Sequence, residues 1–150
     1  MSTNIHSRLI EKFLAQKELA IAGASRDKKK FGNKVFEFLR SKEYNLFPIH
    51  PETTELEGIK CYKTPSEVPQ NIKHLYVVTP QHSTDRIIQW ALERGFDMIW
   101  FQQKSDTPMS LKMAQDKGIE IIKDKCLFMY LDPKGGHAFH RFFVKLFGKL

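Results

Sequence analysis

The fold of this chain is decided by residues 19–33, which read LAIAGASRDKKKFGN. The apolar run at residues 19–22 has the length of a buried β-strand, and Gly23 ends it. Apolar residues return after the loop at helical spacing: Val35, Phe36 and Leu39. We therefore expect a helix from about residue 32 to residue 42. A strand, a glycine turn and a helix in this order predict that a parallel strand follows.

The rest of the chain repeats this alternation. Short apolar runs predict further strands at about residues 44–49, 75–79, 98–101 and 119–122. Amphipathic stretches predict helices at about residues 4–16, around residues 87–92 and around residues 111–114. Residues 51–72 read as irregular, with one short helix near residues 65–68. Strands separated by helices predict an α/β fold with a five-stranded, mainly parallel sheet and helices on both faces. Right-handed crossovers favour a Rossmann-like, doubly wound sheet with strand order 3-2-1-4-5.

Length and composition bound the class of protein. The chain has 150 residues, of which 41% are hydrophobic and 27% charged, and this predicts one globular domain over residues 1–150. Residues 1–17 would carry an N-terminal helix and residues 133–150 a C-terminal amphipathic one. No apolar run approaches the length of a membrane span, and the first residues lack the apolar core of a secretory signal. Cys61 and Cys126 form no CxxC pair, so we expect reduced thiols in a cytoplasmic protein.

The positive charge is concentrated in two places. The net charge is +7, and residues 26–34 and 133–150 each carry an excess of four bases over acids. A positive loop can hold an anionic ligand, although a solvated lysine run has the same charge. In the tail, Phe and Leu residues recur at helical spacing with bases between them. We expect this helix to pack on its own domain or to form a homodimer, with an anionic membrane surface as the alternative.

The expected sheet selects the loops that would bind a ligand. In such sheets ligands bind at the carboxyl ends of the strands, which here are followed by residues 23–33, 50–51, 79–82 and 102–105. In the first loop Gly23 lets the chain turn, and the amides at Gly32 and Asn33 would face a phosphate at the start of the helix. Arg26 and Lys30 could add charge-assisted hydrogen bonds.

The loop differs from two well-known phosphate-binding sequences. If GxGxxG is counted from Gly23, Ser25 and Lys28 stand at the second and third glycine positions, and His50-Pro51 follows strand two in place of an acid. The sequence GxxxxGK[ST] is absent. A ligand with several phosphates and no ribose bound by an acid fits better, and coenzyme A (CoA) is such a ligand. An NAD(P)- or other nucleotide-binding protein and a basic nucleic-acid-binding module remain alternatives, although no nucleic-acid-binding motif is present.

The chain resembles the small stand-alone CoA-binding domain proteins, which are similar to the nucleotide-binding domain of the succinyl-CoA synthetase α subunit. The motifs that carry the resemblance are IAGASR at 21–26, KFGNKV at 30–35, FPIHP at 47–51, VVTP at 77–80, IWFQ at 99–102 and GIEII at 118–122, followed by Cys126. The likeness covers about residues 17–127. Each motif is weak alone, but their order and spacing together are fairly specific.

The resemblance implies reversible binding of CoA or acyl-CoA. It suggests phosphate contacts from Ser25, Arg26, Lys30 and the amides of Gly32 and Asn33. His50-Pro51 would border the adenosine, and Thr79-Pro80 with Gln102 would line the path of the pantetheine arm. The implied cofactor-binding residues are Gly23, Ala24, Ser25, Arg26, Lys30, Phe31, Gly32, Asn33, His50, Pro51, Thr79, Pro80 and Gln102. The family usually has Asn at the position of His50.

Catalysis and metal binding are poorly supported. The synthetase enzymes work with a second domain that carries a phosphorylated histidine, for which this chain is too short. His137 and His140 are three residues apart on a predicted helix, but no third metal ligand is evident nearby. We therefore expect a binding protein with no catalytic residues and no metal.

Overall fold

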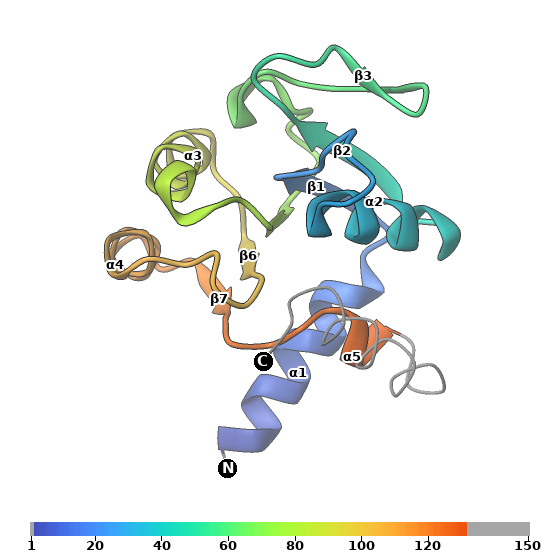
Figure 1. Cartoon of the computed structure of the whole chain (residues 1–150). Helices are drawn as coiled ribbons and strands as arrows, with labels where there is room; N and C mark the ends of the chain where they lie inside the picture. Colours follow the sequence, from blue (N-terminus) through green and yellow to red (C-terminus); the bar gives the residue numbers. More distant parts are fainter. Residues whose placement is uncertain (1, 132–150) are drawn as a thin grey trace.

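The computed structural model describes residues 2–131 and places a five-stranded parallel sheet at the centre (Figure 1). The strand order is β2-β1-β5-β6-β7. The strands are β1 (Glu18–Ala22), β2 (Asn45–Ile49), β5 (His74–Val77), β6 (Met98–Phe101) and β7 (Glu120–Ile122). All neighbouring strands in this sheet pair in parallel, so the expected Rossmann-like α/β class is confirmed.

Helices cover both faces of the sheet (Figure 1). One face carries α1 (Ser2–Ala15), α2 (Phe31–Ser41) and α5 (Phe128–Leu131). The other carries α3 (Gln81–Arg94), α4 (Pro108–Asp116) and the short 3-10 helix η1 (Pro65–Glu67). Strand β1 shows why both faces are apolar: Leu19 and Ile21 belong to the first core, and Ala20 and Ala22 to the second. Successive side chains of a strand point to opposite faces, so a doubly covered strand reads as a continuous apolar run.

The expected strand order 3-2-1-4-5 is wrong. The third long strand, β5, pairs with β1 (Ala20 beside Leu75) instead of with β2, which gives the order 2-1-3-4-5. The outer edge of β2 pairs with Tyr62, whose amide donates to the carbonyl of Pro48 (2.8 Å) and whose carbonyl accepts from His50 (2.7 Å). Pro48 has no N–H to give to a ladder, and such a residue suits an edge strand but not a central one.

The connection between β2 and β5 holds a hairpin that the sequence did not predict. Its strands are β3 (Glu55–Leu56) and β4 (Ile59–Lys60), joined by Glu57-Gly58, both with positive φ. Strands of two residues are too short to show a periodicity, although two central turn residues with positive φ are typical of hairpins. The short helix near residues 65–68 is confirmed as η1, whereas α5 was not predicted. The predicted C-terminal helix at residues 133–150 lies outside the described residues.

Within residues 2–131, no helix combines the length and the apolar character that crossing a membrane requires.

Candidate ligand-binding cleft

A cleft of about 1190 Å³ opens at the carboxyl ends of β1, β2, β5 and β6. Residues from all four predicted loops, 23–33, 50–51, 79–82 and 102–105, line it. Pockets for drug-sized ligands have volumes of about 300–1000 Å³. The cleft therefore has room for a long ligand that crosses several strand ends.

Two glycines bring the loop after β1 against its neighbours. Gly23 has φ of +107°, and a Cβ there would lie 2.6 Å from the carbonyl carbon and oxygen of Val78. A Cβ at Gly32 would overlap the carbonyl oxygen of Gly23. Only residues without a side chain allow these approaches. The turn after β1 and the start of α2 are thus in backbone contact, next to the end of β5.

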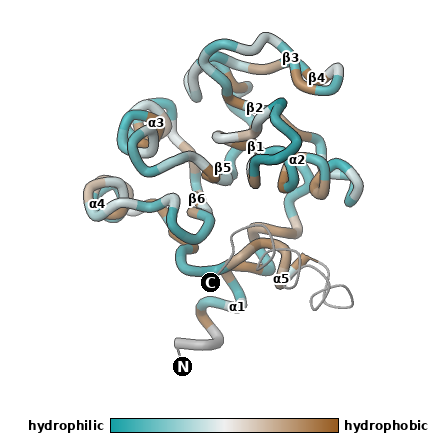
Figure 2. Tube along the Cα trace, viewed as in Figure 1, coloured by the Kyte–Doolittle hydropathy of each residue, from teal (hydrophilic) through white to brown (hydrophobic). Residues whose placement is uncertain are grey.

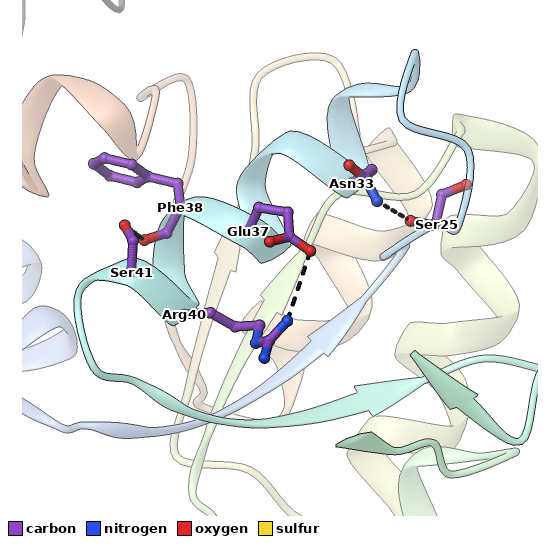
Figure 3. Close-up of polar contacts among 6 residues, drawn as sticks. All are labelled: Ser25, Asn33, Glu37, Phe38, Arg40 and Ser41. Carbon is purple, nitrogen blue, oxygen red and sulfur yellow. Dashed lines mark hydrogen bonds and ion pairs between the residues drawn. The ribbon is translucent and has the colours of Figure 1, made fainter. Parts of the chain in front are cut away.

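The loop between these glycines is held by its own hydrogen bonds. The hydroxyl oxygen of Ser25 accepts from the amide of Asp27 (3.0 Å), and the Asp27 carboxylate accepts from the amide of Lys29 (2.9 Å). The side-chain amide of Asn33 donates to the carbonyl of Ser25 at 2.7 Å (Figure 3). Asn33 is 4% exposed. The loop is therefore shaped by internal contacts. Among residues 2–131 the Ser25 hydroxyl accepts the hydrogen bond from the Asp27 amide and donates none.

The N-terminus of α2 is suited to an anion. The residue before the helix, Lys30, has an extended backbone, no side chain caps this end, and the first turn contains no acid. The first amides of a helix generally lack intrahelical partners, and the helix dipole makes this end partly positive. In this structure the Asn33 amide already donates to the Lys30 carbonyl (3.1 Å), so of the two amides predicted to contact a phosphate it is Gly32 that lines the cleft. The segment that leads into α2 is hydrophilic (Figure 2). Lys29 and Lys30 of this segment line the cleft.

Eleven of the thirteen predicted site residues line the cleft: Gly23, Ala24, Ser25, Lys30, Phe31, Gly32, His50, Pro51, Thr79, Pro80 and Gln102. Asn33 and Arg26 do not. Asn33 instead holds the loop through its hydrogen bond to the Ser25 carbonyl. The charge of the exposed Arg26 has a small effect on two neighbouring groups. Burial lowers the pKa of His50, the Glu52 carboxylate opposes this shift, and the Arg26 charge adds to it. Burial and then the Glu55 carboxylate raise the pKa of the Cys61 thiol, and the Arg26 charge opposes that rise.

The imidazole of His50 closes the turn after β2. Its Nδ1 accepts from the amides of Glu52 (3.1 Å) and Thr53 (2.9 Å). A nitrogen that accepts hydrogen bonds carries no proton, and burial lowers the pKa of His50. The ring is therefore neutral with its proton on Nε2. An Asn at this position could accept the same two amides through its side-chain oxygen.

Gln102 directly follows β6, and two hydrogen bonds to its side-chain oxygen hold the amide group in place. Its Oε1 accepts from the hydroxyl of Tyr76 and from the amide of Leu127 (3.4 Å), and Gln102 is 2% exposed. Burial, and then the neighbouring Cys126, raise the pKa of Tyr76, so its hydroxyl stays protonated. Within residues 2–131, the Gln102 Nε2 has no hydrogen-bond partner. Because Oε1 accepts both hydrogen bonds, the orientation of the side-chain amide is fixed, and Nε2 is the atom without a partner among the described residues.

The sequence analysis missed part of the lining. The additional residues are Lys29, Ile49, Glu52, Lys63, Val78, His82, Ser83, Arg86, Ile87, Trp90, Gln103, Lys104 and Ser105. Several lie inside or next to the predicted loops. Arg86, Ile87 and Trp90 instead lie on α3, beyond its first turn. The sequence analysis assigned Ile87 to the buried face of a helix and did not single out Arg86 or Trp90. A signal in the sequence could have found them. They lie three or four positions apart on a helix whose first turn contributes His82 and Ser83 to the cleft, so they share the face that continues from it.

The charge of the lining is mostly positive. Five cationic side chains, from four segments of the chain, line the cleft: Lys29, Lys30, Lys63, Arg86 and Lys104. Among the described lining residues, Glu52 is the single carboxylate. In the described part of the chain, no three His, Cys, Asp or Glu side chains are grouped so as to hold a metal ion. The cleft is therefore suited to an anionic organic ligand.

A family model and a curated relative both match this chain. The model of the CoA binding domain family matches residues 17–132. The α subunit of acetate–CoA ligase (ADP-forming) II from Pyrococcus furiosus is 26% identical over 132 residues, which are 79% of this chain and 28% of that subunit. The chain thus spans less than a third of this relative.

Solved structures share the fold. A conserved hypothetical protein from Pyrococcus furiosus has a TM-score of 0.70 and 29% identity, over 73% of this chain and 95% of that one. A dinucleotide-forming acetyl-coenzyme A synthetase 1 from Candidatus Korarchaeum cryptofilum has a TM-score of 0.65 and 22% identity, over 75% of this chain and 27% of that one. With the family model matching most of the chain, and with a cationic cleft at the edge where such sheets bind ligands, the protein belongs to the CoA-binding domain family.

Proposed function

We propose that the protein binds coenzyme A or an acyl-CoA reversibly, with no chemical step of its own. The observation that carries the proposal is the meeting of the α2 N-terminus with five cationic side chains in one long cleft. CoA carries a diphosphate and a 3′-phosphate on an extended molecule, so its charge and length match this cleft. The family assignment supports the same ligand.

Each part of CoA has a proposed place. The diphosphate would bind at the amide of Gly32, the hydroxyl of Ser25 and the ammonium of Lys30, because charged donors and helix N-termini favour phosphate oxygens. Residues 50–51 would border the adenosine. Residues 79–80 and Gln102 would line the path of the pantetheine arm. In this scheme Arg26, which does not line the cleft, attracts the phosphates through its charge. Asn33 keeps the shape of the loop through its hydrogen bond to the Ser25 carbonyl.

We limit the proposal to binding because the likeness to the acetate–CoA ligase subunit covers 28% of that relative. The part of the subunit that this chain resembles would supply CoA recognition.

Calorimetric titration of the purified chain with CoA, acetyl-CoA and NAD⁺ tests the function. We expect saturable heat with CoA and acetyl-CoA, a higher melting temperature with either, and neither effect with NAD⁺. Lys30→Gln should weaken CoA binding, whereas Lys112→Gln should leave it unchanged, because Lys112 pairs with Asp116 on the exposed surface of α4, outside the cleft. No heat and no thermal shift with CoA would refute the proposal.

One observation favours a second candidate, an NAD(P)-binding protein. Glu52 lines the cleft just after β2, near the place where dinucleotide-binding folds hold a ribose through an acid. However, Glu52 follows the end of β2 by three residues, and His50 and Pro51 stand directly after the strand. Tighter binding of NAD⁺ than of CoA in the same titration would establish this alternative.

A further inference from the structure

Helix α3 contributes a wall to the cleft that the predicted site did not include. We call Arg86, Ile87 and Trp90 the α3 wall; all three line the cleft. Residues that are three or four positions apart share one face of a helix. Helices α2 and α3 lie on opposite faces of the sheet (Figure 1). The cleft therefore crosses the sheet edge from the α2 N-terminus on one face to the α3 wall on the other.

The α3 wall combines an aromatic ring with a cation. The guanidinium carbon of Arg86 lies 5.7 Å from the centre of the Trp90 ring. Arg86 is exposed, and in the part of the chain that the structure describes it forms no salt bridge. Trp90 is half-buried. A flat ring with an uncompensated guanidinium beside it is chemistry for a planar base that bears an anionic group.

The end of β2 adjoins the same wall. Ile49 packs in the core that also contains Ile88 and Ala91 of α3, and Ile49, His50 and Pro51 line the cleft. The α3 wall and residues 49–51 therefore lie on one side of the cleft. The α2 N-terminus, with Lys30, lies on the other.

The separation of these groups orients the ligand. A nucleotide with its diphosphate at the α2 N-terminus would extend its ribose and base across the sheet edge. Aromatic side chains stack on nucleobases, and every base has a flat face for such stacking. Arginine binds phosphate through two parallel hydrogen bonds. We propose that the α3 wall is the nucleoside subsite, in which Trp90 and Ile87 pack against the adenine and Arg86 binds the 3′-phosphate. This inference rests on the proposed function and adds a preference for CoA over dephospho-CoA.

Tryptophan fluorescence tests the contact with the base. The chain has two tryptophans, and Trp100 is fully buried with its Nε1 donating to the carbonyl of Lys125 (3.1 Å), away from the cleft. A ligand-dependent change therefore reports on Trp90. We expect CoA and 3′,5′-ADP to quench the emission of the wild type and 4′-phosphopantetheine to leave it unchanged. In Trp90→Phe the quenching by CoA should disappear.

A charge variant tests the contact with the 3′-phosphate. Arg86→Gln should weaken binding of CoA about 10-fold or more, as expected for a lost hydrogen bond between charged groups, and should change binding of dephospho-CoA less than 2-fold. The matched control is Arg40→Gln, because Arg40 is an exposed arginine on α2, pairs with Glu37 at 3.8 Å and lies outside the cleft. It should bind both ligands as the wild type does.

The outcomes separate the inference from the proposed function. If CoA binds but Arg86→Gln weakens CoA and dephospho-CoA equally, or neither, Arg86 does not recognise the 3′-phosphate and the inference is wrong. Quenching of Trp90 by 4′-phosphopantetheine would place the thiol arm on the α3 wall and would also overturn it. If the wild type binds no CoA at all, the proposed function fails and the inference fails with it.

Discussion

A side chain at Gly32 would overlap the carbonyl oxygen of Gly23 and place its Cβ 3.0 Å from the Gly23 carbonyl carbon. This backbone contact holds the first turn of α2 against the end of β1. It also brings the amides at the start of α2 to the cleft. The two glycines thus link the stability of the fold to the geometry of the site, and the first prediction follows from this contact.

Gly32→Ala should destabilise the protein by about 3 kcal/mol, because overpacking against backbone atoms cannot be relieved by a rotamer change. Urea denaturation measures the loss. Gly58→Ala is the control, since a Cβ at Gly58 meets nothing within 4 Å and only the positive φ of +80° is unfavourable. Its cost should be about 1 kcal/mol. Equal losses in the two variants would show that the contact between Gly23 and Gly32 is unimportant.

Asn33→Ala should lower both stability and ligand affinity, although Asn33 does not line the cleft. The change removes the 2.7 Å hydrogen bond to the carbonyl of Ser25 and leaves a partly buried acceptor unpaired, which costs about 1–3 kcal/mol. Ser41→Ala is the control on the same helix, where an exposed hydroxyl donates to the Phe38 carbonyl (Figure 3). Thermal melts and CoA titrations compare the two. Unchanged CoA affinity in Asn33→Ala would mean that the loop keeps its shape without this bond.

The free energy of unfolding should fall as the pH drops below 6.5, partly through His50. Burial lowers the pKa of His50 in the folded state below its usual 6.5. Below pH 6.5 the unfolded chain therefore takes up the proton first, and the stability present at neutral pH is lost until the pH passes the folded-state pKa. Protonation at Nδ1 would also break the bonds to the amides of Glu52 and Thr53.

His50→Asn separates this contribution from that of His74, whose pKa burial also lowers. The variant keeps an acceptor for the two amides but does not titrate in this range. Urea denaturation between pH 5 and pH 7.5 should show a shallower loss of stability in His50→Asn than in the wild type. Identical pH profiles would assign the whole loss to other groups.

Lys30→Gln and Arg26→Gln should differ in their effect on CoA binding. Lys30 lines the cleft and Arg26 does not. A lost charge-assisted bond costs about 1.5–3 kcal/mol, whereas a charge at the rim acts through solvent and is screened by salt. Titrations at 50 mM and 500 mM salt should show a large, persistent loss for Lys30→Gln and a small loss for Arg26→Gln that vanishes at high salt. The reverse order would place Arg26 on the phosphate.

Much of the fold could be predicted because the relevant patterns are local. The run at residues 19–22 ends at Gly23 and is followed by helical spacing, so a strand, a turn and a helix could be assigned from a few neighbouring residues. The location of the cleft was also predictable, although the predicted strand order was wrong. In any all-parallel order the loops that follow the strands emerge at the same edge of the sheet.

The strand order itself contained one readable clue, Pro48. A central strand needs hydrogen bonds on both edges, and proline cannot donate one. The predicted order put this strand between two others, whereas the structure puts it at the edge, paired on its outer side with Tyr62. The pairing with Tyr62 depends on a hairpin too short to give a pattern, so it was not predictable.

The amino-acid sequence by itself determined the alternation of strands and helices, the glycine turn after the first strand and the edge of the sheet where a ligand would bind. Only the tertiary structure decided that β5 lies beside β1, that Asn33 supports the loop while Lys30 faces the cleft, and that Arg86 and Trp90 of α3 join the lining. The physical reason is the separation along the chain over which each kind of interaction acts. Periodicity and turn chemistry act between residues a few positions apart, whereas strand pairing and the lining of a cleft depend on packing between segments that are distant along the chain.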